Sequence, residues 1–399
     1  MAVATGGDIP SRRAHSIAVM KMANGFHKLG HDVKVLTVER FSENKMKKKM
    51  KDVHDLYGVD HAIQIVYFRD YFYYFENFTP FDHVFRLLDK VMSRKLRYIA
   101  DPERRISDYC REHEFDLCYY RGYGRVAYYN VVKNRVPTIM ESHIRNTNNP
   151  DLRRAVKVSH SEYFKGLVTI SEVLKREFVK AGVPEEKILV LSSGVDLEAF
   201  QHLPDTKDAR EMLNLPLDKK IIVYTGSLFP EKGIKQILLV AERLPEALFL
   251  LVGGEPKYIR FWKNYADSHG IRNVRFTGFV SNKMIPIYLV AADVLLMPYE
   301  KRPARIMDIE STSPLKLFEY MAAKKPIVST NIPAISRYVT HGVDGLLAEP
   351  GNINQLTDYV RLVMEDIGLA RKLSENAYEK VKALDWRERC RKILKRFCS

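Results

Sequence analysis

Short apolar runs alternate with longer stretches of helical periodicity along the first half of the chain. An apolar run at residues 2–4 predicts a strand, and a loop with glycine and proline separates it from a helical pattern at 14–29 that Gly30 closes. A strand at 32–38 follows, which completes a βαβ unit and starts a parallel sheet. Further strands are predicted at residues 62–68, 117–120, 138–140 and 166–169, so the first half is expected to be doubly wound.

The pattern starts again after the polar stretch 214–218. We predict strands at 221–225, 248–252, 274–277, 294–297 and 326–329, a turn at 226–233, and helices at 234–244 and 314–323. A second Rossmann-like half is therefore expected, and the fold class is α/β with two doubly wound domains that face a central cleft. Since open parallel sheets bind ligands at the carboxyl ends of their strands, we expect the active site in that cleft. The last segment, residues 369–397, is predicted to be helical and basic.

Composition supports a globular protein. A chain of 399 residues with 46% hydrophobic and 28% charged residues is long enough for two full cores. No signal peptide and no apolar run of about 20 residues is found, so neither secretion nor a membrane span is expected. The four cysteines have neither metal spacing nor the density of a disulfide scaffold, which favours a reducing cytoplasm.

The net charge of +15 indicates an anionic ligand or surface. Residues 1–199 hold 33 Lys and Arg against 26 Asp and Glu, a net charge of +7, which leaves +8 for the remainder. An excess spread over both halves argues against a nucleic-acid-binding arm, so no nucleic-acid partner is expected. The densest cluster is Lys45, Lys47, Lys48, Lys49 and Lys51, which is more often a solvated face than a binding site.

The stretch from Ser313 to Val328 carries the most chemical information. Ser313 suits a helix N-cap and Pro314 the first helical position, so the free N–H groups and positive dipole end of this helix would suit a diphosphate. Glu319 lies five residues further than Pro314, where its carboxylate would accept hydrogen bonds from two ribose hydroxyls. An ordinary helix with an exposed glutamate is the alternative.

This stretch resembles the C-terminal signature of glycosyltransferase family 4, retaining transferases of the GT-B fold, and the resemblance covers nearly the whole chain. It implies two glutamates with seven residues between them. Glu319 matches the second, which binds ribose, while Ser311 stands at the first position, after Glu310. The chain thus departs from the pattern where the donor sugar is read. The resemblance implies donor-binding roles for Ser311, Ser313, Pro314, Leu315, Lys316 and Glu319.

A second match runs from Tyr224 to Gly233. The resemblance implies that Gly226, Ser227 and Lys232 bind the donor, with Lys232 as a point charge on its phosphates. Family members commonly have an arginine where Ser227 stands. Either Arg13 or another basic residue compensates, or phosphate binding relies more on the helix end at 313–316.

Three further segments resemble parts of the family site. Pro137 to His143 is a strand that ends in histidine, and the resemblance implies that His143 touches the transferred sugar or the reaction centre. The loop 6–16 is a variant of the family's Gly-Gly loop, and Arg12, Arg13 and His15 are its candidates for acceptor or phosphate binding. Phe279 and Val280 are expected to hold the base.

The resemblance implies a retaining, front-face substitution in which the departing diphosphate takes the proton of the acceptor. His143, Glu319 and Lys232 are the expected catalytic residues. No cofactor or metal is required, since Lys232 and the helix N-terminus replace the cation. The implied domains are 1–200 for the acceptor, 201–376 for the nucleotide sugar, and a C-terminal helix at 377–399, around Trp386, that crosses back to the first domain.

The acceptor is expected to be a saccharide or a lipid-linked saccharide. The aromatic stretch 66–78, followed by Phe81 and Phe85, together with the lysine cluster suggests peripheral contact with an anionic membrane on its cytoplasmic side. These rings equally suit a core or a sugar-binding groove. Two other functions remain open: an isomerase like the UDP-N-acetylglucosamine 2-epimerases, and a non-catalytic protein that binds sugar nucleotides or anions.

Overall fold

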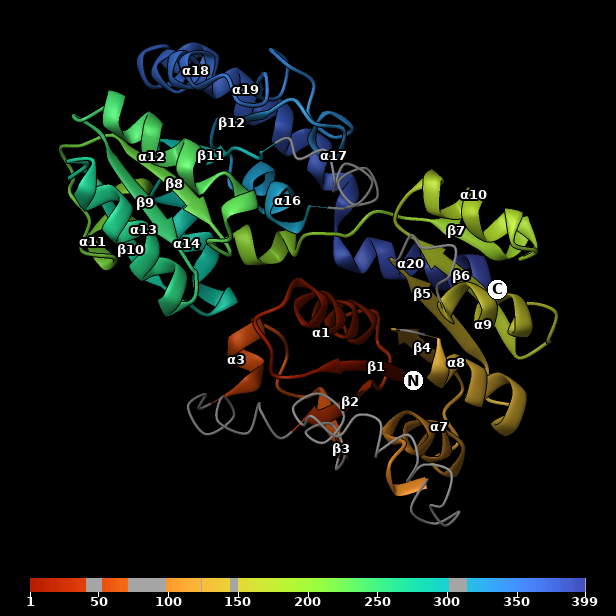
Figure 1. Ribbon diagram of the computed structural model, residues 1–399. Helices are drawn as coiled ribbons and strands as arrows, with labels where there is room; N and C mark the ends of the chain where they lie inside the picture. The colour runs from red at the N-terminus through yellow and green to blue at the C-terminus, as the bar shows by residue number, and fades with distance from the viewer. Residues whose placement is uncertain (41–51, 71–97, 123, 144–149, 301–313, 399) are drawn as a thin grey trace. The chain divides into compact units, whose positions relative to one another are not determined.

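The computed structural model describes residues 1–40, 52–70, 98–122, 124–143, 150–300 and 314–398 (Figure 1). The chain forms two compact units, one of Met1–Ser193 with Trp386–Ser399 and the other of Gly194–Asp385. These boundaries differ from the predicted positions 200/201 and 376/377. Leu197 and Phe200 pack against the core of the second unit, and α19 (Ile367–Val381) remains in that core up to Val381, so both segments belong to the second unit.

The first unit is built on a sheet of seven parallel strands in the order β3-β2-β1-β4-β5-β6-β7. The order reverses between β1 and β4, as in a doubly wound fold, which confirms the predicted architecture of the first half. The strands are β1 (Ala2–Asp8), β2 (Lys34–Arg40), β3 (Gln64–Asp70), β4 (Cys118–Arg121), β5 (Thr138–Ser142), β6 (Phe164–Thr169) and β7 (Ile188–Val190).

Helices cover both faces of this sheet, with α7, α8 and α9 on one face and α1 and α20 on the other (Figure 1). Their starts follow the capping rules: Asp101 accepts a hydrogen bond at the start of α7, and Ser171 does the same for α10. The helices are α1 (Ala14–His27), α3 (Val53–Tyr57), α7 (Pro102–Glu112), α8 (Arg125–Tyr128), α9 (Pro150–Val158), α10 (Glu172–Lys180) and α20 (Trp386–Phe397).

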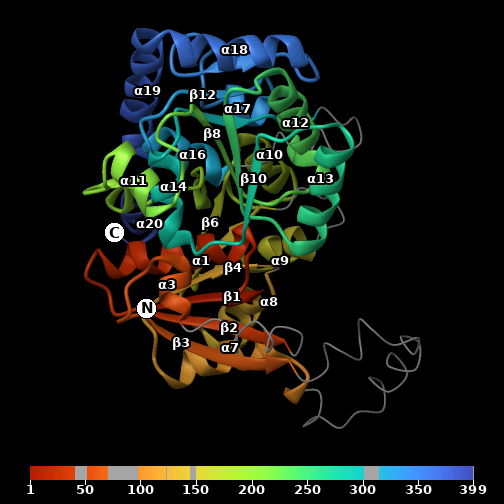
Figure 2. The ribbon, with the colours of Figure 1, turned by 90° about the vertical axis from the view of Figure 1, so that its left-hand side faces the viewer.

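The second unit contains six parallel strands in the order β10-β9-β8-β11-β12-β13. Helices α11, α14, α16, α17 and α19 bury their apolar sides on one face, and α12, α13 and α18 on the other (Figure 2). The strands are β8 (Ile221–Thr225), β9 (Leu248–Val252), β10 (Val274–Gly278), β11 (Val294–Met297), β12 (Ile327–Thr330) and β13 (Leu346–Ala348). The helices are α11 (Thr206–Met212), α12 (Ile234–Arg243), α13 (Pro256–Ser268), α14 (Ile285–Val290), α16 (Leu315–Ala322), α17 (Pro333–Ser336), α18 (Ile353–Glu365) and α19.

The first strand is longer than predicted. Gly6 and Gly7 were expected in a loop, but β1 continues through them to Asp8, which pairs with Val38 of β2 after a shift in register. The side-chain oxygen of Thr5 accepts a hydrogen bond from the N–H of Gly7 at 2.9 Å, which stabilises this irregular stretch. The glycines therefore extend the sheet, and the loop to α1 begins only after Asp8.

The predicted helix at 369–397 is interrupted. Helix α19 ends at Val381, and Asp385 is in an extended conformation, where its carboxylate accepts a hydrogen bond from the N–H of Leu197 at 3.3 Å. The final helix, α20, starts at Trp386 and packs along α1 in the first unit. The chain thus leaves the second unit at Asp385 because this residue pairs with the incoming segment rather than continuing the helix.

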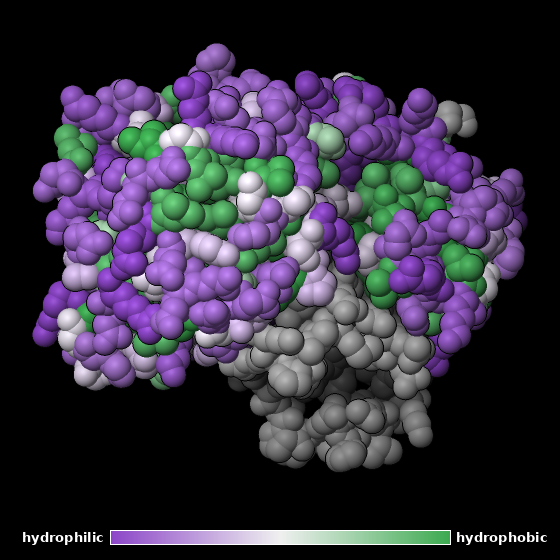
Figure 3. Space-filling model, turned by 90° about the horizontal axis from the view of Figure 1, so that it is seen from above, coloured by the Kyte–Doolittle hydropathy of each residue, from purple (hydrophilic) through white to green (hydrophobic). Residues whose placement is uncertain are grey.

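No helix among the described residues is long and apolar enough to cross a membrane. On the face of the molecule shown in Figure 3, hydrophilic residues predominate, and hydrophobic residues gather in separate patches between them.

We expect Gly25→Val to lower the free energy of unfolding by about 1–3 kcal/mol, the usual cost of overpacking. A Cβ atom at Gly25 would lie 2.7 Å from Sγ of Cys390 and 3.0 Å from the carbonyl oxygen of Trp386, so α1 and α20 would have to separate. Urea unfolding followed by circular dichroism measures the loss. The control is Gly368→Val in α19, where the nearest neighbour of the added Cβ is a carboxylate oxygen of Asp366 at 3.4 Å. An equal loss in both variants would contradict this account of the α1–α20 contact.

Candidate functional site

The described site candidates lie after the carboxyl ends of strands, most of them near the point in each sheet where the strand order reverses. In the first unit this point lies between β1 and β4, and in the second between β8 and β11. Open α/β sheets bind ligands at these points because the connections leave the sheet in opposite directions. We describe the two groups of residues separately, each within its own unit.

In the second unit, the turn after β8 passes close to the segment after β11. Gly226 has a φ of +125° and Gly233 a φ of +75°, conformations that favour glycine. A Cβ atom at Gly233 would lie 2.0 Å from the carbonyl oxygen of Pro298, so only glycine allows this approach. The hydroxyl of Tyr224 donates a hydrogen bond to the carbonyl oxygen of Ser227 at 2.8 Å and fixes the turn from the strand side.

Helix α16 begins one residue later than predicted. Pro314 was expected at the first helical position, but it occupies the N-cap position with an extended ψ of 95°, and the helix starts at Leu315. The N–H of Leu317 donates to the carbonyl oxygen of Pro314 at 3.0 Å, which satisfies one of the first turn's donors. Ser311 and Ser313, predicted to read the donor and to cap the helix, lie outside the described residues.

Lys316 and Glu319 lie three residues apart and therefore share one side of α16, the less buried one. The opposite side carries Leu317, Phe318 and Tyr320 into the core. The hydroxyl of Tyr320 accepts a hydrogen bond from the N–H of Thr225 at the end of β8, at 2.8 Å. This contact fixes the start of α16 against the turn that follows β8.

Lys316 places its ammonium group at that turn. Its Nζ lies 3.9 Å from the centre of the Tyr224 ring and would lie 2.9 Å from a Cβ atom at Gly226. Burial, and next the repulsion of Lys232, lower the pKa of Lys316 well below its usual range, against the attraction of Glu319. Among the residues that the structure describes, this ammonium group has no hydrogen-bond partner.

The remaining donor-site candidates lie at the same edge of the sheet. Lys232 ends the turn after β8, with its Nζ 5.2 Å from the centre of the Tyr299 ring. Phe279 and Val280 directly follow β10, after Gly278, and Phe279 is 37% exposed. The structure therefore brings Gly226, Lys232 and Lys316 together. It places the base-binding candidates, Phe279 and Val280, directly after the edge strand β10.

In the first unit, His143 follows β5 and has both ring nitrogens engaged. Its Nδ1 lies 3.2 Å from Nη2 of Arg121, and its Nε2 contacts Oε1 of Glu141. A guanidinium only donates and a carboxylate only accepts, so these partners select the neutral tautomer with the proton on Nε2. Burial, and next the charge of Arg121, lower the pKa of His143 to about 4.

Glu141 is buried in β5 and is surrounded by cations and donors. Nη2 of Arg389, from α20, lies 3.2 Å from Oε1 of Glu141, and the hydroxyl of Tyr119 donates to Oε2. Burial alone would raise the pKa of Glu141, but Arg389 and His143 outweigh it and lower the pKa to about 2. Arg389 also donates from Nε to the carbonyl oxygen of Ser192 at 2.8 Å, which fixes its position.

His15, in the first turn of α1, belongs to the same group. Its Nε2 lies 2.7 Å from Oγ1 of Thr5, and burial, followed by the charge of Arg121, lowers its pKa to about 3. Arg12 and Arg13 are exposed, and Arg13 is the last residue before α1. The structure thus brings His15 and His143 into one cluster, with Arg12 and Arg13 on the exposed connection beside it.

Sequence reasoning missed three members of this cluster: Arg121, Glu141 and Arg389. The charged Glu141 within an otherwise apolar strand was a usable signal, because a carboxylate in a buried strand needs cations nearby. The position of Arg121 as the last residue of a buried strand was a weaker signal. Arg389 gave no signal, since its helix is basic throughout and only the fold places it at Glu141.

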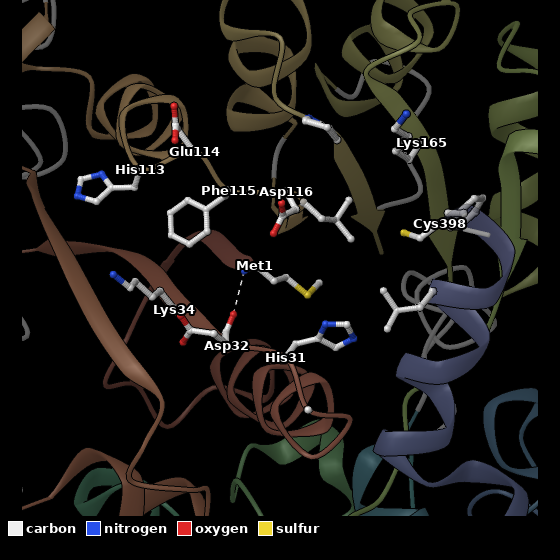
Figure 4. Close-up of a pocket in the computed structure, with 15 residues that line it drawn as sticks. Met1, His31, Asp32, Lys34, His113, Glu114, Phe115, Asp116, Lys165 and Cys398 are labelled. Atoms are coloured by element: carbon white, nitrogen blue, oxygen red, sulfur yellow. Dashed lines mark hydrogen bonds between the residues drawn. The ribbon is translucent and has the colours of Figure 1, made fainter.

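A pocket of about 890 Å³ in the first unit lies at the opposite edge of the sheet (Figure 4). Its walls include polar residues of both signs of charge that lie before the strands or in their first residues: His31, Asp32, Lys34, Glu114, Asp116 and Lys165. None of the predicted site residues lines this pocket. The mixed charges do not select an anion, so we place the candidate site at the carboxyl ends of the strands.

Two models of glycosyltransferase families match the chain. Residues 16–199 match the model described as Glycosyltransferase Family 4, and residues 205–380 match the model described as Glycosyl transferases group 1. Together the two matches cover most of both units. They favour a transferase over the epimerase and the non-catalytic binding protein that the sequence left open.

Two characterised relatives match about half of this chain. A GDP-mannose-dependent alpha-(1-6)-phosphatidylinositol monomannoside mannosyltransferase of Mycobacterium tuberculosis is 27% identical over 203 residues, which are 49% of this chain and 52% of the relative. A processive diacylglycerol alpha-glucosyltransferase of Acholeplasma laidlawii is 27% identical over 168 residues, 40% of this chain and 46% of the relative. The chain therefore spans about half the length of these curated relatives.

The fold matches solved structures over the whole chain. The Anabaena protein HepE, solved in complex with UDP-glucose, has a TM-score of 0.70 at 18% identity, with 99% of this chain and 98% of that chain covered. At this level of identity, the similarity concerns the fold alone.

We expect the protein to lose stability as the pH falls from 7 to 5. The folded pKa values of about 4 for His143 and about 3 for His15 lie below the ordinary value near 6.5, so in this range only the unfolded chain takes up these protons. The stability is present above about pH 6.5 and is lost as the pH falls, by on the order of 1–2 kcal/mol per histidine. Urea unfolding at both pH values measures the loss.

The variants His15→Gln and His143→Gln should each reduce this pH dependence, because they remove one group that protonates only on unfolding. His160→Gln, at an exposed position, is the control and should leave the pH dependence unchanged. An unchanged difference between pH 7 and pH 5 in both site variants would overturn the assignment of two buried neutral histidines.

Proposed function

We propose, from the premise that this chain belongs to the family 4 and group 1 glycosyltransferases, that it transfers a sugar from a nucleoside diphosphate donor with retention at the anomeric carbon. The proposed acceptor is a saccharide or lipid-linked saccharide in the synthesis of a surface glycan or glycolipid. The GT-B fold and the residues at the carboxyl ends of both sheets support this reaction.

The ammonium group of Lys316 is the observation that carries the proposal. It is half-buried at the Gly226 turn, near a second cation, Lys232, and at the start of α16. Among the described residues it forms no ion pair, and the negative charges of a diphosphate would compensate a cation that burial and Lys232 disfavour. Lys316 would thus supply the second cation where Ser227 replaces the family's usual arginine. Of the two alternatives that the sequence left open, this is the one in which the helix end at 313–316 binds the phosphates.

The other donor-site residues take roles that suit their positions. The N–H groups at the start of α16, from Leu315 on, would donate to the phosphates, and Glu319 would accept hydrogen bonds from the ribose hydroxyls. Phe279 and Val280 would hold the base at the end of β10. Ser311 and Ser313 remain predicted contacts to the donor sugar and the helix start. HepE, whose structure contains UDP-glucose, supports a nucleotide sugar as the donor.

The proposed reaction is a front-face substitution. The bond from the anomeric carbon to the diphosphate breaks, the bond to the acceptor oxygen forms on the same face, and the diphosphate takes the acceptor's proton. Lys232 and Lys316 stabilise the leaving diphosphate, so no metal is needed for this step. His143 is held in its neutral form by Arg121 and Glu141, and a hydrogen bond from its ring to the sugar requires that one of these contacts open.

The acceptor is assigned to the first unit. His15 is buried there and Arg12 and Arg13 are exposed, so the two arginines would meet an anionic group of the acceptor. The relatives from M. tuberculosis and A. laidlawii are named for lipid acceptors, which supports a lipid-linked acceptor here. Cytoplasmic location with peripheral membrane contact remains part of the proposal, and most of the aromatic and lysine-rich stretches behind it lie outside the described residues.

One nucleotide should raise the thermal stability of the protein. At 100 times its dissociation constant, a bound nucleoside diphosphate stabilises the fold by about 2.7 kcal/mol, or roughly 5–10 °C in melting temperature. We would screen UDP, GDP, ADP and CMP with their common sugar conjugates, with and without EDTA. The expected result is a shift with one base that EDTA leaves unchanged and that Glu319→Ala abolishes. No shift with any nucleotide at millimolar concentration would remove the donor from the proposal.

Lys316→Gln should lower kcat/KM for the donor by about 100-fold, because it removes a cation that stabilises the leaving diphosphate. The matched control is Lys324→Gln. Lys324 also contacts an aromatic ring, with its Nζ 4.1 Å from the centre of Tyr378, but it follows the end of α16 and is exposed. Donor turnover measured by release of the nucleoside diphosphate compares the two. A Lys316→Gln variant with the kcat/KM of the control would show that Lys316 does not bind the phosphates.

A further inference from the structure

Asp52, His54 and His61 gather at the start of α3, in the first unit, and no step of the proposed reaction uses them. Each offers one ligand atom, and these atoms all lie within 4.8 Å of one another. Asp52 is the N-cap residue of α3, where its Oδ1 accepts hydrogen bonds from the N–H groups of His54 and Asp55. His61 lies in the turn that leads into β3.

The ring of His54 is oriented by a backbone carbonyl group. Its Nε2 lies 2.8 Å from the carbonyl oxygen of Ile63, which can only accept, so the proton is on Nε2. In the neutral ring, Nδ1 therefore directs a lone pair toward the carboxylate of Asp52. Two lone pairs facing each other repel unless a proton or a metal ion lies between them. A backbone carbonyl on the far nitrogen is the usual way in which proteins orient a metal-binding histidine.

Each imidazole nitrogen lies near a different oxygen of the Asp52 carboxylate, farther than a direct hydrogen bond and at a distance compatible with a metal ion between the groups. Nδ1 of His54 lies 3.4 Å from Oδ1 of Asp52, and Nδ1 of His61 lies 3.4 Å from Oδ2 of the same carboxylate. A direct hydrogen bond would be about 2.7–3.2 Å long. Two ligands at about 2.1 Å from a tetrahedral zinc ion are about 3.4 Å apart.

The second nitrogen of His61 faces another carboxylate. Its Nε2 lies 3.7 Å from Oδ1 of Asp55, on the side where an imidazole bound to a metal through Nδ1 carries its proton. The rings of His54 and His61 are stacked, with centres 5.0 Å apart, so their Nδ1 atoms are held on one side of the cluster. The ring of His54 is thus held by a hydrogen bond, and His61 has a carboxylate on the matching side of its ring, beyond hydrogen-bond distance.

We propose that Asp52, His54 and His61 form a binding site for a divalent transition metal ion of the zinc type, completed by water. Two imidazole nitrogens and one carboxylate oxygen suit zinc, whereas calcium and magnesium prefer oxygen ligands alone. The ion would join the start of α3 to the turn before β3. The site is structural and is independent of donor binding in the second unit.

Zinc binding to the purified full-length chain, stripped with a chelator and then titrated in competition with a fluorescent zinc indicator, tests the proposal. The background is Cys398→Ser, because Cys398 is an exposed thiol that would bind zinc by itself. We expect one equivalent of Zn²⁺ per chain. His61→Ala and Asp52→Asn should each weaken its binding by about 10-fold or more. Co²⁺ in place of Zn²⁺ should give a visible absorption band that both variants lose.

The controls separate loss of the site from loss of the fold. His61 is 62% exposed, and asparagine retains the N-cap hydrogen bonds of Asp52, so both variants should keep the circular dichroism spectrum of the parent. His160→Ala removes an exposed histidine elsewhere in the unit and should leave zinc affinity unchanged. The proposal is overturned if the parent binds no equivalent of zinc, or if both site variants bind it as tightly as His160→Ala does.

Discussion

A charge that is removed from water needs a counter-charge close by, and this requirement organises the carboxyl ends of the strands in both units. In the first unit, the charge is that of Glu141, buried in β5. Arg389 and Arg121 supply positive charge, and Tyr119 and His143 donate hydrogen bonds to the carboxylate. The carboxylate is therefore paired within the protein, while two arginines share it, and burial together with the repulsion of Arg389 lowers the pKa of Arg121 to about 9.

The second unit leaves the same requirement unmet. Lys316 is half-buried near Lys232, and the attraction of Glu319 does not prevent the fall in its pKa. The two clusters thus differ: in the first, a buried carboxylate is paired with cations of the protein, and in the second, a half-buried lysine would be stabilised by a bound anion. A transferase whose donor carries two phosphates supplies such an anion. The electrostatic difference between the units therefore matches the division into an acceptor side and a donor side.

The sequence predicted elements well where a strand is apolar on both faces. The bounds of β8, β9 and β11 agree with those predicted, because glycine or proline directly follows each of these buried runs. The sequence failed where a tertiary contact overrides a local signal, as at Gly6 and Gly7 in β1 and at Asp385 before α20. For the site, family resemblance pointed to His143, whose role stays a prediction, but nothing in the sequence pointed to Arg389, whose proximity to Glu141 depends on the whole fold.

The final helix is therefore part of the first unit's cluster and not an appendage to it. Arg389 of α20 stabilises the ionised carboxylate of Glu141. The ionised Glu141 in turn selects the tautomer of His143. Arg121 enforces the same tautomer from the other nitrogen. The state of the histidine at the end of β5 thus depends on a residue near the end of the chain. The close contact of α1 with α20 at Gly25 serves this arrangement, because it brings the guanidinium within reach of the strand.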